Sequence, residues 1–185
     1  MLIREVERKI AEFSPQFTLE SLRFLGNGTS STAFLANEEW IFRFPQEVEE
    51  IQKTLEKEIA LLPKLSEVLP VKIPQFQYIA RNPFGSLIYV GYHMLPGVPL
   101  EKSVFESMEP YKQEQVLEVL ASLLRSIHSF PVAIARTCKV EEEIYKGAYH
   151  PEQKCFLQEI RHFLTQEEIA HIESIFAAYE RDSAN

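Results

Sequence analysis

Residues 26–45 decide the fold and read Gly-Asn-Gly-Thr-Ser-Ser-Thr-Ala-Phe-Leu-Ala-Asn-Glu-Glu-Trp-Ile-Phe-Arg-Phe-Pro. A loop of small and hydroxyl residues runs into an alternating strand, turns at residues 37–39 and returns as a second strand. Glycines allow the backbone to approach an anion closely and to offer it N–H groups. Arg43 stands among aromatic and aliphatic neighbours, where an unpaired charge is costly. A hairpin that covers a phosphate group explains both features.

The composition is that of a globular protein with 185 residues, 45% of them hydrophobic and 25% charged. No apolar run reaches membrane-spanning length, and the first eight residues carry mixed charge, unlike a signal peptide. The two cysteines, Cys138 and Cys155, have neither metal-site spacing nor a disulfide framework. We therefore expect a cytoplasmic protein without a membrane partner.

The net charge of −8 argues against a nucleic-acid partner. The acidic excess lies mainly in residues 100–185, which hold 9 basic and 15 acidic residues, against 10 and 12 in residues 1–99. A solvated helical surface is the favoured explanation, and a cationic ligand is the alternative. Of the 27 acidic residues, only Asp182 is an aspartate.

The first half of the chain alternates between helical and extended patterns. Spacing of apolar residues predicts helices over residues 2–13 and 46–67, the second kinked or restarted at Pro63. Glu58 lies beside the apolar stripe of that second helix. Extended segments are predicted at 17–25 (ended by Gly26), 32–36, 40–44, 75–81 and 86–94.

The second half is helical. Residues 95–99, Leu-Pro-Gly-Val-Pro, form the clearest break in the chain. Helices are predicted at 110–129, 152–164 and 166–181, and Thr165 with Glu168 forms a capping box for the last. The predicted class is α+β: a five-stranded antiparallel sheet with a helix in residues 1–95, then a partial helical lobe in 96–185.

Five segments in this order resemble the aminoglycoside phosphotransferase group of the protein-kinase-like fold, which includes choline kinases. Their match extends to about Pro131. The segments are Gly26-x-Gly28, 40–45 (WIFRFP), 56–65 (EKEIALLPKL), 90–100 (VGYHMLPGVPL) and 123–131 (LLRSIHSFP).

The resemblance implies a site for ATP or GTP, with Mg²⁺ in the full-length family member. Residues 26–31 would cover the phosphates, with Ser31 in place of the third glycine of the kinase pattern; a polar hairpin turn is the alternative. Arg43 would take the place of the usual phosphate-binding lysine and pair with Glu58; solvation of both side chains is the alternative. The carbonyl of His93 and the N–H of Leu95 would bind the purine edge.

The catalytic part of the pattern is absent. No His-x-Asp occurs in residues 1–185, and Asp182 follows Arg181 in a helical tail, so the sequence offers neither a catalytic base nor metal-binding aspartates. Two hypotheses follow. The chain is the N-terminal part of an aminoglycoside-type phosphotransferase and is inactive alone, or it is a complete non-catalytic binding or interaction module.

The apolar stripe of the helix predicted at 110–129 bears on the association of the protein with itself. In a kinase-like protein that lacks its remaining helices, this stripe would stay exposed, and exposed apolar helices associate. The sequence therefore predicts self-association through this surface. By resemblance, a cationic small molecule such as an aminoglycoside is the expected second partner.

Overall fold

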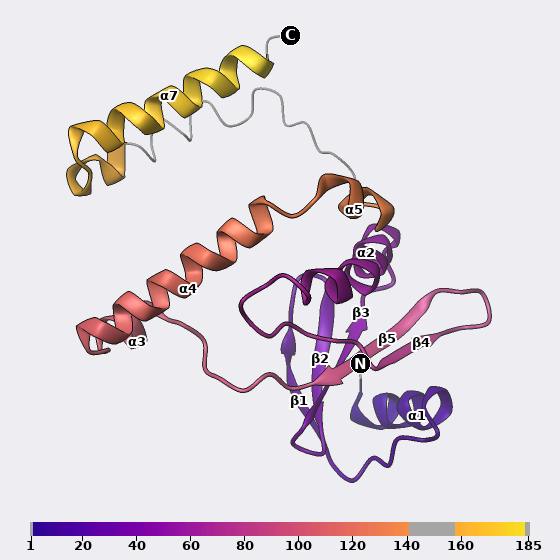
Figure 1. Ribbon diagram of the computed structural model, residues 1–185. Helices are drawn as coiled ribbons and strands as arrows, with labels where there is room; N and C mark the ends of the chain where they lie inside the picture. Colours follow the sequence, from indigo (N-terminus) through magenta and orange to yellow (C-terminus); the bar gives the residue numbers. More distant parts are fainter. Residues whose placement is uncertain (1, 141–157, 184–185) are drawn as a thin grey trace. The chain divides into compact units, whose positions relative to one another are not determined.

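The computed structural model describes residues 2–140 and 158–183 (Figure 1). Its contacts divide the chain into two compact units, Met1–Val140 and Glu141–Asn185. The first unit contains a five-stranded antiparallel sheet in the order β1-β2-β3-β5-β4. The predicted α+β class with this sheet is confirmed. The strands are β1 (Leu22–Asn27), β2 (Ser31–Ala36), β3 (Trp40–Pro45), β4 (Tyr78–Arg81) and β5 (Leu87–His93).

The helices of this unit lie before, within and after the sheet in sequence. The long helix α2 forms one continuous element through Pro63, so the predicted restart at this residue is wrong. Pro63 has no N–H to donate to the Ile59 carbonyl, so the helix continues through it with one backbone hydrogen bond fewer. The helices are α1 (Ile3–Phe13), α2 (Glu49–Leu65), α3 (Lys102–Glu106), α4 (Pro110–His128) and α5 (Val132–Thr137).

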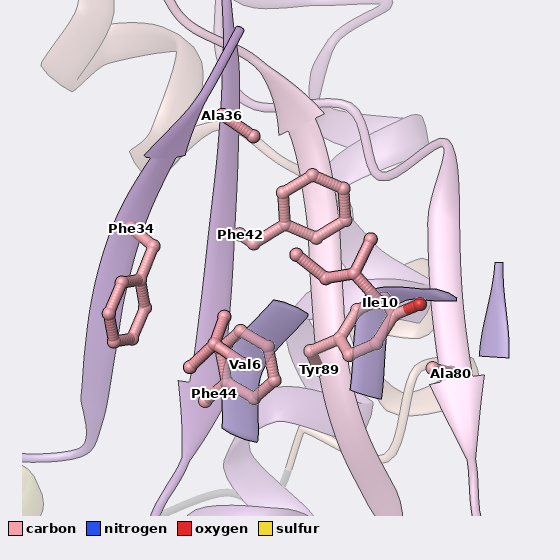
Figure 2. Packing of buried hydrophobic residues seen from close by; sticks show 8 residues of the cluster. All are labelled: Val6, Ile10, Phe34, Ala36, Phe42, Phe44, Ala80 and Tyr89. Atoms are coloured by element: carbon pink, nitrogen blue, oxygen red, sulfur yellow. The ribbon is translucent and has the colours of Figure 1, made fainter. Parts of the chain in front are cut away.

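The sheet separates two apolar clusters because successive side chains of a strand point to opposite faces. On one face, Val6 and Ile10 of α1 pack with Phe42 and Phe44 of β3 and with Tyr89 of β5 (Figure 2). The other face carries a smaller cluster of Leu55, Leu87 and Val90 beneath α2. Alternation along β3 therefore places Arg43 on the α2 face.

The β2–β3 turn has the geometry that its sequence predicts. Asn37 and Glu38 both have positive φ angles, 52° and 55°, as a tight hairpin turn requires. The Asn37 side chain also accepts hydrogen bonds from the N–H groups of Glu20 and Ser21, at 2.8 and 3.1 Å, and donates to the Thr18 carbonyl at 2.8 Å. One side chain thus holds the segment that leads into β1.

The first strand differs from its prediction. The sequence indicated a strand over 17–25 that Gly26 ends, whereas β1 begins at Leu22 and passes through Gly26. Residues 18–21 are held by the Asn37 side chain, and Gly26 pairs with Ala33 after a bulge that follows Phe24. A glycine is compatible with a bulge, and for this reason it did not end the strand.

In the second unit, the helix α7 (Gln166–Ser183) has the predicted capping box. The Thr165 hydroxyl accepts a hydrogen bond from the Glu168 N–H at 3.3 Å, and the Glu168 carboxylate accepts one from the Thr165 N–H at 2.8 Å. The hydrogen bonds that the Thr165 N–H and hydroxyl donate to this carboxylate lower the pKa of Glu168. The helix predicted at 152–164 lies partly outside the described residues, which show a 3₁₀ turn at Arg161–Phe163.

Candidate functional site

The site is centred on an ion pair between the sheet and α2. Nη1 of Arg43 lies 2.9 Å from Oε2 of Glu58, and the predicted pair is therefore present. The two side chains are 21% and 33% exposed, so the pair is partly screened from water and still partly accessible. The Arg43 Nε donates to the Ser31 hydroxyl at 3.4 Å. Three residues that the sequence singled out thus meet in space.

Alternation and helical spacing explain this meeting. Ser31 and Arg43 lie on the same face of neighbouring strands, because Ala33 pairs with Arg43 in the β2–β3 register. Glu58 lies on α2 three residues after Leu55, whose side chain is 3% exposed against the sheet. A helix that buries Leu55 therefore directs Glu58 towards the same face of the sheet.

Tyr92 is a neighbour of this pair that the sequence reasoning missed. Burial raises the pKa of its hydroxyl; the Arg43 charge lowers this pKa and the Glu58 charge raises it, so the phenol lies within electrostatic reach of both. Tyr92 pairs with Ile41 on β3, and Ile41 lies two residues before Arg43. The side chains of Tyr92, Ile41 and Arg43 therefore lie on the same face of the sheet. The alternation of side chains along β5 was the sequence signal that could have placed Tyr92 on this face.

The loop between β1 and β2 is closed by its own hydrogen bonds. The Gly28 N–H donates to the Ser31 carbonyl at 2.8 Å, and the Gln46 N–H donates to the Ser30 carbonyl at 3.0 Å. The Gly28 amide is therefore engaged within the turn. A Cβ at Gly26 would meet no atom within 4 Å, so local packing does not require a glycine at this position.

The predicted purine-binding residues lie at the end of β5. The Met94 N–H donates to the Glu39 carbonyl at 2.8 Å, which holds this segment against the β2–β3 turn. The His93 ring stacks on Trp40 with centroids 3.7 Å apart. His93 and Leu95 border a cleft of about 440 Å³, whose other wall is formed by residues 66–77.

Two further residues of α2 bind the sheet and were not predicted. The Gln52 side chain accepts a hydrogen bond from the Leu87 N–H at 2.8 Å and donates to the Leu87 carbonyl at 3.1 Å. Glu56 pairs with Arg81 of β4, at 2.8 Å between Oε2 and Nη2. The Arg81 hydrogen bond lowers the pKa of Glu56. The pair therefore stabilises the fold above the ordinary glutamate pKa, and this contribution is lost as the pH falls through the lowered value.

Within residues 2–140 and 158–183 there is no cluster of three or more His, Cys, Asp or Glu side chains suited to a metal ion. The helices described here are also too short or too polar to cross a lipid bilayer.

Comparisons with known proteins agree on one family. The sequence model described as "Phosphotransferase enzyme family" matches residues 21–181. A mutant of aminoglycoside 2′-phosphotransferase-IIIa in complex with GDP superposes with a TM-score of 0.73 at 25% identity over 95% of this chain. The GDP and kanamycin complex of APH(2″)-IIIa gives 0.72 at 25% identity over 96%. The ADP-bound APH(2″)-Ib shares the fold, with a TM-score of 0.64 at 20% identity over 95%.

The chain spans 57–59% of the length of these three solved proteins, so its helical part is partial relative to theirs. The family model covers most of the sequence, including both compact units. The five-stranded sheet and the ion pair between β3 and α2 lie inside the matched region. The chain belongs to the phosphotransferase enzyme family.

Proposed function

We propose that this chain is the nucleotide-side portion of an aminoglycoside-type phosphotransferase and that it binds GTP or ATP without transferring phosphate by itself. The observation that carries this proposal is the Arg43–Glu58 pair. Arg43 is also hydrogen-bonded to Ser31, where the β1–β2 loop ends. A held, partly exposed cation next to a loop of small residues is what the phosphates of a nucleotide need. Two solved structures of a similar phosphotransferase in complex with GDP support this choice of ligand.

The spacing of the two predicted contact regions also fits one nucleotide. Arg43 pairs with Val90, and His93 follows three residues later on β5. At about 3.3 Å per residue, the phosphate and purine contacts would lie about 10 Å apart. In this arrangement Gly26, Gly28 and Ser31 cover the phosphates, while the His93 carbonyl and the Leu95 N–H bind the base.

The lack of a His-x-Asp sequence in residues 1–185 is the reason to expect no turnover from this chain. It also favours the second candidate, a non-catalytic module that binds a nucleotide or a protein partner. We expect a polycationic aminoglycoside as the acceptor in an active family member, as the kanamycin complex of a relative supports. We propose a cytoplasmic location, because a nucleotide-dependent role needs the nucleotides of the cytoplasm.

Gly26→Ala tests the proposed role of the loop. The added Cβ meets no protein atom within 4 Å, so the melting temperature without nucleotide should stay unchanged. The same methyl group would occupy space that a phosphate needs, and the affinity for GTP and ATP should fall at least about tenfold, or about 1.4 kcal/mol. Calorimetric titration and thermal unfolding of purified residues 1–185 measure the two quantities.

Four outcomes are distinct. Weaker binding at unchanged stability supports a backbone approach to the phosphates. Wild-type affinity in Gly26→Ala contradicts this approach, although nucleotide binding itself stands. If the unmodified chain binds neither GTP nor ATP, the proposed function is wrong, and steady nucleotide turnover by residues 1–185 contradicts the proposed lack of catalysis.

Self-association through α4 is a separate prediction. Its apolar residues Leu117, Leu120, Leu124 and Ile127 are 38–55% exposed. We expect sedimentation velocity to show a dimer or larger species that increases with protein concentration, because pairing would bury this stripe. Leu124→Lys should shift the protein towards monomer. A monomer at the highest soluble concentration would contradict the prediction.

A further inference from the structure

Three polar side chains of α2 contact three neighbouring strands. Glu58 pairs with Arg43 on β3, Gln52 bonds both backbone groups of Leu87 on β5, and Glu56 pairs with Arg81 on β4. The sheet has these strands side by side in the order β3-β5-β4. The helix is therefore fixed to each of the three strands by at least one polar contact.

The order of the contacts around the helix matches the order of the strands. With about 100° of rotation per residue, Glu56 lies about 40° to one side of Gln52 and Glu58 about 120° to the other. Leu55 and Ile59, which pack towards the sheet, lie between Glu58 and Gln52. A rotation of α2 about its axis would lengthen the contacts on one flank. These three polar contacts therefore fix the rotation of α2 about its own axis.

The Gln52 contact occupies a gap in the sheet. The pairing of β3 with β5 extends only as far as Val90, so Leu87, three residues further along, has Arg81 of β4 as its strand partner and none on β3. Leu87 is 4% exposed, and unpaired backbone groups at a buried position are costly. The Gln52 amide supplies both the acceptor and the donor, as a neighbouring strand would.

Arg81 connects Glu56 of α2 to the β4–β5 turn. Besides its two bonds to Glu56, its guanidinium donates to the Gly85 carbonyl at 3.2 Å. The planar fork of arginine suits this bidentate contact with a carboxylate. α2 is thus linked through one side chain to both a strand and the turn that follows it.

We propose that Gln52 and the Glu56–Arg81 pair are positioning residues that hold α2 in the rotation at which Glu58 meets Arg43. None of them has to touch a ligand: they act through the placement of Glu58. The inference rests on the proposed nucleotide site for its functional meaning, while the positioning itself is measurable in the free protein.

Gln52→Leu removes both hydrogen bonds at similar volume. The readout is the ¹H–¹⁵N signal of the Arg43 Nε–H, assigned by its loss in Arg43→Lys. We expect this signal to shift and broaden in Gln52→Leu, and the GTP affinity to fall about three- to tenfold. Arg81→Gln, which alters an exposed pair, should change the signal in the same direction and serves if Gln52→Leu does not fold.

Tyr89→Phe is the matched control. It removes a buried hydrogen bond of 2.7 Å between Tyr89 and Ser14 on the α1 face, away from α2. It should lower the melting temperature and leave both the Arg43 signal and the GTP affinity unchanged. The same signal in Gln52→Leu, Arg81→Gln and the unmodified chain would overturn the proposal. A changed signal in a chain that binds no nucleotide would support the positioning and contradict the proposed function.

Discussion

Replacing Phe42 by alanine is expected to lower the free energy of unfolding of the Met1–Val140 unit by about 3–5 kcal/mol. The Phe42 side chain is fully buried, and its ring lies 5.1 Å from that of Phe17 and 5.3 Å from that of Tyr89. A Cβ on the paired residue Gly91 would lie 2.8 Å from the Phe42 ring, so the aromatic side chain fills the space that this glycine leaves open. The alanine variant would lose this contact and leave a cavity.

Phe84→Ala is the control for this prediction, since it makes the same chemical change at a position that is 94% exposed. Its cost should stay within about 0.5 kcal/mol. Urea unfolding followed by the fluorescence of Trp40, which is the only tryptophan and contacts the same cluster, measures both variants. Equal costs for the two phenylalanines would contradict the assignment of Phe42 to the core.

Much of the sheet was predictable because its signals are local. The alternation in residues 32–44 and the Asn-Glu-Glu turn predict β2 and β3, and the structure places these strands at Ser31–Ala36 and Trp40–Pro45. After Pro45 the spacing of apolar residues changes from the alternation of a strand to the period of a helix, and this change predicts α2. The Arg43–Glu58 pair was implied by the family resemblance, and the apolar neighbours of Arg43 favoured a paired over a solvated cation.

The remaining contacts depend on the register of distant strands and had no local signal. The sequence does not show that β3 ends its pairing at Val90, so the partner of Gln52, 35 residues away, could not be inferred. Arg81 is likewise 25 residues from Glu56. The short helices α3 and α5 were also missed, since five or six residues are too few to show a helical period.

Helix α5 shows why the first compact unit extends beyond the break at residues 95–99. The thiol of Cys138, at the end of α5, donates to the Ala60 carbonyl of α2 at 3.4 Å and is 2% exposed. The packing thus joins a segment after the break to the helix of the sheet. Sequence composition marks the break itself, but it contains no information about a contact that spans 78 residues.

Arg43→Glu is expected to weaken GTP and ATP binding about 100-fold, which corresponds to about 2.8 kcal/mol. The substitution replaces the only cation of the Ser31–Arg43–Glu58 cluster by a carboxylate that faces Glu58 at short range. Two anions would then repel both each other and the phosphates in a partly buried place, where charges are weakly screened. Calorimetric titration gives the affinity, and urea unfolding gives the cost of the lost pair.

Exchanging the two charges separates stability from binding. In the double variant Arg43→Glu with Glu58→Arg, opposite charges face each other again, so most of the lost stability should return. The cation now stands on α2 instead of β3, and a phosphate held by the loop after β1 would no longer lie within its reach. Nucleotide binding should therefore stay weak in the exchanged variant. If the exchange restored the affinity together with the stability, Arg43 would act only through its ion pair, and its proposed contact with the phosphates would be wrong.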